Sequence, residues 1–273
     1  MNRNLIILLL IGSSVAGQSA RVFGQVFEEN TEQSQLQLGQ RPFNYFNDCE
    51  DALKKGFKMS GVYHIKPKAS FRPFRVWCDM ETDGGGWTLI QARFDGLIDF
   101  FRNWVAYRNG FGSVDSEHWL GNNFMHQITE NNDYQLKIEV TGFLENEFAF
   151  AKYSPFRIGS EDENYKLYVG NFTGEGQISD SLTYHNGSMF TTTDKHNDGY
   201  VFNCATRFKS AWWFRSCFFV NLNGIWMSKH RSLASRGSQS PDNQNGVNYR
   251  QAFNDDFYSL KSVEMKVRRM RPA

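Results

Sequence analysis

Alternating apolar and polar residues mark three segments of the chain as strands with one buried face. These segments are Tyr134 to Val140, Tyr165 to Val169 and Val263 to Val267. A period of two places every second side chain on the same side of a strand. Helical patterns are few: Asp48 can cap a short helix through Asp51 to Lys55, and Ser116 to Leu120 predicts the start of another.

About the last 90 residues show little periodicity and are rich in Gly, Asn, Asp and Ser, which favour turns. They predict a loop-built subdomain that depends on a disulfide, with an ion as a further candidate support. The glycines Gly84 to Gly86 predict a tight turn that enters a strand at Trp87. Trp212 and Trp213 are expected in the core, and one of them is a candidate pocket wall.

The first residues carry Arg3, then an apolar run from Leu5 to Ile11, then small residues up to Ala16. This order predicts a secretory signal at residues 1–16 and hence a secreted, extracellular protein. The apolar run is about half the roughly 20 residues that a membrane-spanning helix needs, so no membrane insertion is expected. Residues 17–47 are rich in Gln, Glu and Asn, which predicts a flexible lead-in.

Four cysteines follow, namely Cys49, Cys78, Cys204 and Cys217. In an oxidising compartment an even number favours two disulfides, but four cysteines allow three pairings. The pairs that are local in sequence, Cys49 with Cys78 and Cys204 with Cys217, are favoured. The sequons at Asn171 and Asn186 are candidate N-glycosylation sites in a secreted chain.

The charge balance excludes recognition by a bulk electrostatic field. The chain has 30 basic and 29 acidic residues, so nothing points to nucleic acid or an anionic membrane as a partner. Recognition must therefore depend on a local site. No sustained heptads or Gly-X-Y repeats are present. A homo-oligomer would have to form through the globular part or through the apolar patch at Val22 to Phe27.

Several short motifs, taken in their order along the chain, resemble the fibrinogen C-terminal domain family, which includes ficolin-like and tachylectin-like lectins and angiopoietins. The motifs are Asp48-Cys49, Ser60-Gly61-Val62-Tyr63, Val76-Trp77-Cys78-Asp79-Met80, Gly84-Gly85-Gly86-Trp87-Thr88, Trp104, Tyr107, Gly110-Phe111-Gly112, Glu117, Trp119-Leu120-Gly121-Asn122, Asn203-Cys204-Ala205, Trp212-Trp213, Asn221-Leu222-Asn223-Gly224 and Tyr258-Ser259-Leu260-Lys261.

This resemblance implies an α+β fold over residues 48–273. Its expected parts are a small N-terminal disulfide subdomain, a central twisted and mostly antiparallel sheet, and a loop-rich C-terminal subdomain that carries a calcium loop and a binding pocket. The resemblance also implies the local cysteine pairing.

A calcium loop is the first candidate site. The spacing of Asp194, His196 and Asp198 imitates an EF-hand, but its twelfth position falls on Ala205, which excludes that motif. The resemblance instead places the calcium ligands at His196, Asp198 and the carbonyl groups of Tyr200 and Phe202.

His196 stands where the family has the first acidic calcium ligand, and calcium prefers oxygen ligands to an imidazole nitrogen. The substitution should weaken a site of about 0.1 to 1 mM affinity, unless Asp194 compensates. A zinc site from His185, His196 and a carboxylate is a weaker hypothesis.

A sugar pocket beside the loop is the second candidate site. The resemblance implies a cis peptide at Ser216-Cys217 whose amide meets an acetyl group, although a cis bond without proline costs about 3 to 4 kcal/mol. Phe208 stands where a tyrosine is usual, Phe218 where a histidine is usual, and Asn243 near a second usual tyrosine. These changes remove polar contacts and keep an apolar wall.

The leading hypothesis is a secreted, non-enzymatic lectin that binds acetylated glycans, such as N-acetylglucosamine, on microbial or cell surfaces in innate immunity. The alternative is an angiopoietin-like ligand or matrix component that binds an extracellular or cell-surface protein, with degenerate calcium and sugar sites. An enzyme is disfavoured because no Gly-x-Ser-x-Gly elbow, phosphate-binding glycine loop or His-Glu-x-x-His motif is present. Asp255 and Asp256 are adjacent carboxylates that a solvated turn explains.

Overall fold

The computed structural model describes residues 45–131, 134–237 and 243–270, with the side chain of Asn243 left out. The chain divides into two units, Met1–Asn44 and Tyr45–Ala273, and only the second is described below. The predicted secretory signal and most of the predicted lead-in, including Val22 to Phe27, therefore lie outside the described residues.

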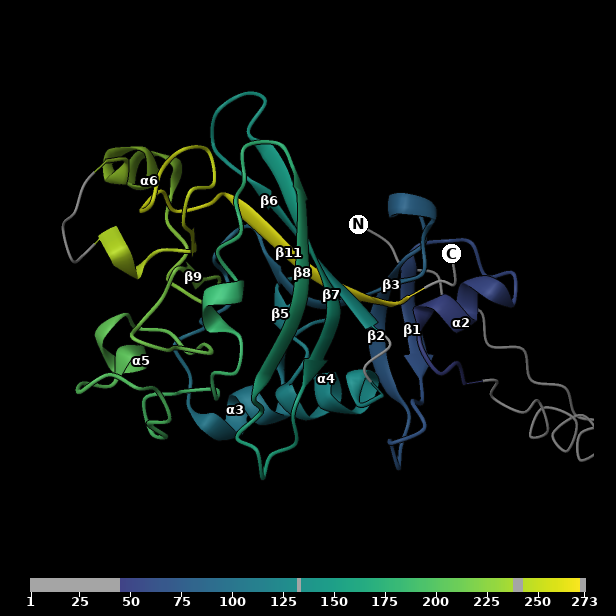
Figure 1. The fold of residues 1–273 in the computed structure, drawn as a ribbon. Coiled ribbons are helices and arrows are strands. Elements are labelled where there is room, and N and C mark those ends of the chain that lie inside the picture. The colour runs from purple at the N-terminus through teal and green to yellow at the C-terminus, as the bar shows by residue number, and fades with distance from the viewer. Residues whose placement is uncertain (1–44, 132–133, 238–242, 271–273) are drawn as a thin grey trace, which may run out of the picture. The chain divides into compact units, whose positions relative to one another are not determined.

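A small disulfide subdomain opens the described chain (Figure 1). It consists of helix α2 (Cys49–Lys54) and strands β1 (Gly61–Ile65) and β2 (Phe74–Asp79), which pair antiparallel. The carboxylate of Asp48 caps α2 by accepting the N–H of Asp51 at 2.7 Å. The disulfide Cys49–Cys78 ties the helix to β2, so the predicted cap and the first predicted pairing are confirmed.

The predicted glycine turn joins the short helix η1 (Thr82–Gly84) to strand β3 (Trp87–Arg93). Gly85 has φ 74°, and a Cβ built there would lie 2.2 Å from the carbonyl oxygen of Met80. Only glycine meets both conditions without displacing the backbone. The turn places Trp87 in the core, where its side chain is fully buried.

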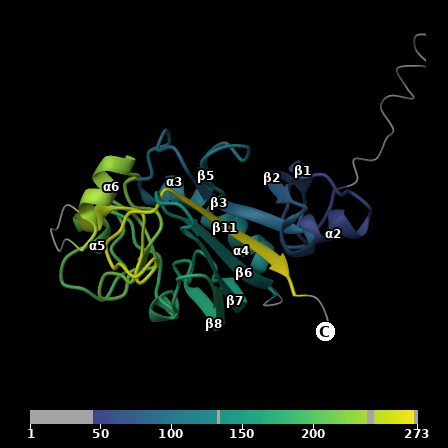
Figure 2. The ribbon, with the colours of Figure 1, turned by 90° about the horizontal axis from the view of Figure 1, so that it is seen from above.

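A twisted antiparallel sheet forms the centre of the described unit. Its strands follow the order β1-β2-β3-β11-β6-β7-β8. Two short strands extend it, because β5 (His118–Trp119) pairs with β3 and β4 (Phe111–Gly112) pairs with β5. The remaining long strands are β6 (Tyr134–Thr141), β7 (Phe148–Ile158), β8 (Leu167–Glu175) and β11 (Ser262–Arg269). Strand β11 comes last in the chain yet lies between β3 and β6, so it joins the early and middle parts of the sheet (Figures 1 and 2).

The strands predicted from Tyr134 and from Val263 are confirmed, and the one predicted from Tyr165 begins only at Leu167. The polar positions do not all face water. Lys137 in β6 and Lys266 in β11 have side chains that are only 3% and 1% exposed. Both ammonium groups contact Glu139, at 2.7 and 2.6 Å, and Lys266 also contacts Asp79 at 2.8 Å. The second face of the sheet is therefore covered by paired charges.

Two helices cover the lower end of the sheet in Figure 1, namely α3 (Trp104–Asn109) and α4 (Asn122–Thr129). In the sequence between these helices lie the short strands β4 (Phe111–Gly112) and β5 (His118–Trp119). The predicted helix start at Ser116 is wrong, because Trp119 pairs with Gln91 of β3 and with Phe111 of β4. Gly121, at φ 113°, separates this strand from α4.

The C-terminal subdomain is built mainly of loops, as predicted. Its regular elements are short: η2 (Thr183–His185), α5 (Cys204–Arg207), β9 (Val220–Asn221), α6 (Lys229–Ser235), η3 (Asn243–Asn245) and β10 (Asn248–Tyr249). Trp212 and Trp213 are both fully buried and pack against Trp119, so neither is an exposed pocket wall. The disulfide Cys204–Cys217 closes the subdomain and confirms the second predicted pairing.

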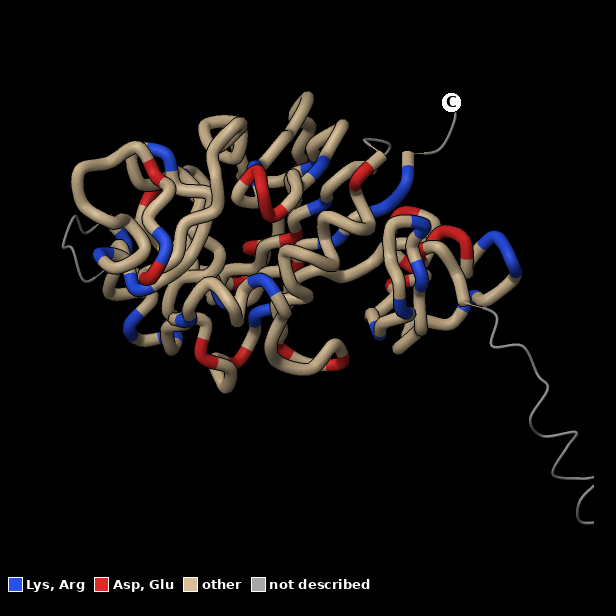
Figure 3. Tube along the Cα trace, turned by 90° about the horizontal axis from the view of Figure 1, so that it is seen from below, with Lys and Arg blue, Asp and Glu red and all other residues tan. Residues whose placement is uncertain are grey.

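Within the described residues, no helix combines the length and apolar character that crossing a bilayer requires. Basic and acidic positions are interspersed along the chain in Figure 3, in keeping with the net charge of +1.

Candidate functional site

The predicted calcium loop is organised around the carboxylate of Asp198, whose side chain is fully buried. Its Oδ1 accepts the Nε2–H of His196 and the backbone N–H of Tyr200, both at 3.1 Å. Its Oδ2 accepts the backbone N–H of Cys204 at 3.3 Å. Three N–H donors thus surround the carboxylate and hold the loop against the start of α5.

Asp194 does not join Asp198. Its Oδ1 accepts the backbone N–H of Trp104 at 2.9 Å and the hydroxyl of Thr192 at 2.7 Å. The carboxylate therefore stabilises the N-terminal end of α3. The idea that Asp194 replaces the lost acid finds no support in this arrangement.

These residues do not fit a calcium ion in the arrangement observed. Calcium takes six to eight oxygen ligands, whereas here one carboxylate is occupied by N–H donors and the neighbouring side chain is an imidazole. Within the described part of the chain, no three side chains of the His, Cys, Asp or Glu type come close enough to hold a metal. His196 therefore contacts Asp198 directly, and we derive no role for a cation.

The predicted cis peptide at Ser216-Cys217 is wrong. Among the described residues, the cis bond lies at Ser154-Pro155 instead. The turn at the second disulfide is made by Cys217 in a left-handed conformation, with φ 58°, and the N–H of Arg215 donates to the carbonyl of Cys217 at 3.0 Å. The Ser216 amide donates to the hydroxyl of Tyr184 at 3.3 Å, so it already has a partner.

The predicted apolar wall of the sugar pocket is part of the core. Phe208 and Phe218 are 6% and 5% exposed, and their rings pack edge to face with centroids 4.8 Å apart. Each ring thus occupies the space beside the other, and little of either faces a ligand. The side chain of Asn243, the last predicted member of this pocket, lies outside the described residues.

An exposed aromatic surface lies beside the loop. We call it the aromatic loop surface, and it comprises Tyr184, Tyr200, Val201, Phe202, Arg215, Phe219 and Arg250. Val201 is 84% exposed and Phe202 67%. The N–H of Gly199 donates to the carbonyl of Arg215 at 2.9 Å, which joins this loop to the segment before the second disulfide cysteine.

Stacked rings and arginines form the second half of the aromatic loop surface. The rings of Tyr184 and Phe219 lie nearly parallel, with centroids 4.2 Å apart. Arg215 lies over Tyr184 at 5.7 Å and Arg250 lies over Phe219 at 4.6 Å. Cation–π contacts of this kind fix the guanidinium groups while leaving them able to form hydrogen bonds.

Comparison with known proteins identifies the family. The family described as "Fibrinogen beta and gamma chains, C-terminal globular domain" matches residues 45–270. The chain belongs to this family. Its fibrinogen-like domain has the expected α+β fold, with the antiparallel sheet and both local disulfides.

The fibrinogen-like domain resembles proteins of several kinds. Bovine "Microfibril-associated glycoprotein 4" is 40% identical over 270 residues, which cover 97% of this chain and 96% of the relative. Mouse "Fibrinogen-like protein 1" is 40% identical over 256 residues, which cover 89% of this chain and 77% of the relative.

Two solved structures extend the comparison. The fibrinogen-like globe domain of human ANGPTL2 is 39% identical with TM-score 0.75, covering 82% of this chain and 99% of that one. Lamprey fibrin D-dimer, solved with the peptide Gly-His-Arg-Pro-amide, is 29% identical with TM-score 0.74, and the match covers 93% of this chain and 87% of that one.

One residue that organises the fibrinogen-like site was missed from the sequence. His185 was considered only as a zinc ligand, yet it is fully buried and both of its nitrogens have partners. Nδ1–H donates to the carbonyl of Trp213 at 2.7 Å, while Nε2 accepts the N–H groups of Phe219 and Val220 at 3.1 and 3.0 Å. Burial lowers the pKa of His185 to about 4, so the ring is neutral and positions Phe219.

The two sequons lie along the outer strand of the sheet. Asn171 is exposed on β8 and Asn186 is exposed after η2, where its Oδ1 accepts the N–H of Val169 at 3.1 Å. Both side chains are therefore accessible at positions where N-glycosylation remains a prediction.

Proposed function

We propose that this protein is a secreted, non-enzymatic recognition protein that binds an extracellular protein partner through the aromatic loop surface, without calcium. The observation that carries the proposal is the exposure of Val201 and Phe202 on a loop that is fastened at both ends. Exposed apolar side chains on a fixed loop cost solvation free energy, which a partner would recover.

The composition of the aromatic loop surface supports a protein partner. Aromatic residues and arginine are enriched at protein–protein interfaces and among the residues whose truncation most weakens binding. Here Phe202, Tyr184 and Phe219 supply rigid rings, while Arg215 and Arg250 supply planar hydrogen-bond donors. The partner would therefore offer an apolar pocket for Phe202 and carboxylates for the two arginines.

The relatives support the same class of function. They include a microfibril-associated glycoprotein, a fibrinogen-like protein and ANGPTL2, and the lamprey fibrin structure holds a peptide ligand. Secretion is supported by the predicted secretory signal, by two disulfides and by two exposed sequons. The absence of catalytic motifs from the sequence agrees with a binding role.

Calcium independence rests on the contacts of Asp198. An imidazole N–H and two backbone N–H groups already donate to this carboxylate, so the loop keeps its shape without a cation. Binding of acetylated glycans has weaker support, because Phe208 and Phe218 pack against each other in the core. The hypothesis of a protein partner is therefore the stronger of the two.

The test is binding of the fluorescently labelled full chain to extracellular matrix laid down by cultured fibroblasts and stripped of cells. We expect saturable binding that disappears when the matrix is first digested with trypsin. The double substitution Val201→Asp and Phe202→Asp should weaken this binding at least tenfold, since it places two charges on the apolar half of the aromatic loop surface.

Leu97→Asp provides the matched control, because Leu97 is 82% exposed on a loop outside the aromatic loop surface. It should leave binding within twofold of the unmodified chain. Equal binding by the Val201 and Phe202 double variant would overturn the proposal, provided that the variant has an unchanged thermal unfolding midpoint.

A further inference from the structure

The central sheet divides at β3, and a cleft lies at the division. One edge of β3 pairs with β11 from Thr88 to Arg93. The other edge pairs with β2 near Thr88 and with β5 at Gln91 and Ala92. Strand β2 must therefore leave β3 to make room for β5, so the first half of β2 has β1 as its only strand neighbour among the described residues.

Strand β4 supplies the opposite wall. It pairs with β5 on one side, through Phe111 with Trp119 and Gly112 with His118, and no described strand lies on its other side. The N–H of Ser113 donates to the carbonyl of Glu117 at 3.2 Å. Gly112 has φ 82°, and a Cβ built there would lie 2.1 Å from the carbonyl oxygen of Glu117, so β4 departs from extended geometry at its second residue.

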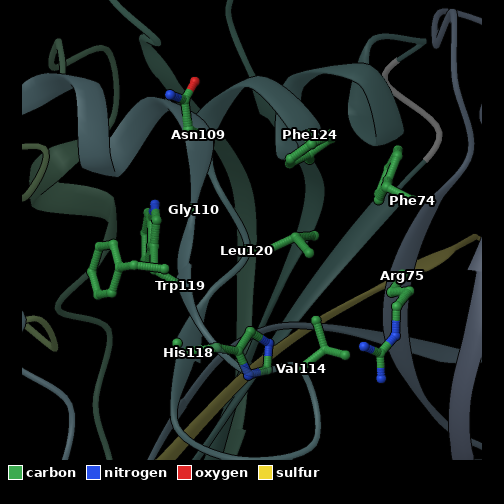
Figure 4. Close-up of a pocket in the computed structure, with 11 residues that line it drawn as sticks. Phe74, Arg75, Asn109, Gly110, Val114, His118, Trp119, Leu120 and Phe124 are labelled. Atoms are coloured by element: carbon green, nitrogen blue, oxygen red, sulfur yellow. The ribbon is translucent and has the colours of Figure 1, made fainter.

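The cleft between these strands has a volume of about 260 Å³ and a mainly apolar lining (Figure 4). Phe74 of β2 and Phe124 of α4 contact each other with ring centroids 4.4 Å apart. Leu120 and Val114 lie on the β5 side of the lining. Phe74 comes from β2 and the other three from residues 114–124. Leu120 is 6% exposed, so the partly exposed Phe74, Val114 and Phe124 form the surface for one apolar side chain of a ligand.

A single positive charge accompanies this apolar surface. Arg75 is exposed on β2, and Figure 4 shows its side chain extending toward Val114 and His118. Within the described residues, no ion pair of 4 Å or less involves Arg75, although the hydrogen bond from Ser113 and the charge of Arg75 both lower the pKa of the exposed Asp115. His118 also lines the cleft, but burial lowers its pKa and its Nδ1–H donates to the carbonyl of Ser116 at 2.9 Å. Arg75 is therefore the charged member of the lining at neutral pH.

We propose that this forked-sheet cleft binds an extended, acidic peptide segment of an extracellular protein. An apolar side chain of the segment lies among Phe74, Val114 and Phe124, and a neighbouring Asp or Glu pairs with Arg75. The backbone of the segment runs along the edge of the first half of β2, which β3 leaves unpaired. An extended segment matches the geometry because one wall is the unpaired edge of β2, and strand edges bind peptides by adding a strand.

This site is separate from the aromatic loop surface. The cleft lies between β2, β4, β5 and α4, whereas the aromatic loop surface belongs to the C-terminal subdomain. The two proposals can therefore succeed or fail independently.

The experiment is selection of peptides from a displayed library of random seven-residue sequences on the immobilised full chain. Affinities of the selected peptides are then measured by fluorescence polarisation. We expect selected sequences with Phe, Leu or Ile within two residues of Asp or Glu. Their binding should weaken at least tenfold with Arg75→Glu, which reverses the charge, and with Val114→Trp, which fills the cleft.

Two matched variants control for charge and size. Arg72→Glu makes the same charge change at an exposed residue outside the lining, and Leu97→Trp adds the same ring elsewhere. Both should leave affinity within twofold, as should the Val201 and Phe202 double variant. The proposal is overturned if no selected peptide binds more tightly than 1 mM, or if Arg75→Glu and Val114→Trp leave binding unchanged. It is equally overturned if octanoate binds while no peptide does, since a small apolar acid would then be the ligand.

Discussion

Acidification should destabilise the C-terminal subdomain through His185. The ring is fully buried, its Nδ1–H donates to Trp213, and its Nε2 accepts two backbone N–H groups. Protonation would place a positive charge in the core and turn the Nε2 acceptor into a donor that faces two other donors. Burial accordingly lowers the pKa of His185 to about 4, whereas a histidine in an unfolded chain titrates near 6.5.

The sign and size of the effect follow from this difference. Between about pH 6.5 and pH 4 the unfolded chain binds the proton and the folded chain does not, so stability falls as the pH falls. With these two pKa values, the loss between pH 7.5 and pH 5.0 is about 2 kcal/mol. His118 acts in the same direction, because burial lowers its pKa as well. A variant of His185 is therefore needed to isolate its share.

The assay is urea denaturation at pH 7.5 and pH 5.0, followed by tryptophan fluorescence with the disulfides intact. His185→Gln should lower stability at both pH values but should lose about 2 kcal/mol less on acidification than the unmodified chain. His230→Gln is the control, since His230 is exposed on α6 and should leave the pH dependence unchanged. Equal pH dependence in the unmodified chain and in His185→Gln would refute the reasoning.

Two further predictions concern Glu117 and the loop at Asp198. The Glu117 carboxylate accepts four backbone N–H groups between Phe94 and Ile98 at 2.7 to 3.1 Å and lies 3.8 Å from the buried Arg93. Glu117→Gln should therefore lower the free energy of unfolding, measured by urea denaturation, by about 3 to 5 kcal/mol. A cost below about 1 kcal/mol would contradict that account. His196→Asp should bind calcium with a dissociation constant of about 0.1 to 1 mM, measured by calorimetry, while the unmodified chain should give no heat. Calcium binding by the unmodified chain would contradict the interpretation of the Asp198 contacts.

Several elements of the fold could be predicted from the sequence because local patterns determine them. The period of two identified β6 and β11, and the cap at Asp48 identified α2. The same period did not predict the burial of Lys137 and Lys266. The sequence does not show that Glu139 of β6 contacts both ammonium groups or that Asp79 of β2 also contacts Lys266. The helix expected at Ser116 failed for a similar reason, since pairing of Trp119 with β3 overrides local preference.

The candidate site was less predictable than the fold. The disulfides were predicted correctly, but the roles of single residues depended on contacts between distant segments. His185 lies 34 residues before Phe219 in sequence, and only the folded chain shows that it orders that segment. Phe208 and Phe218 were expected to face a ligand, yet they pack together because both are apolar and adjacent in the fold. The forked-sheet cleft also depends on strand pairing that no local pattern reveals.

The comparison that tests the central claim most directly is binding of the full chain to cell-free matrix in EDTA, in millimolar calcium and in excess N-acetylglucosamine. A protein partner at the aromatic loop surface predicts the same trypsin-sensitive isotherm in all three conditions, weakened at least tenfold by the Val201 and Phe202 double substitution. Binding that requires calcium and is displaced by N-acetylglucosamine would contradict the claim and restore the interpretation of the chain as a lectin.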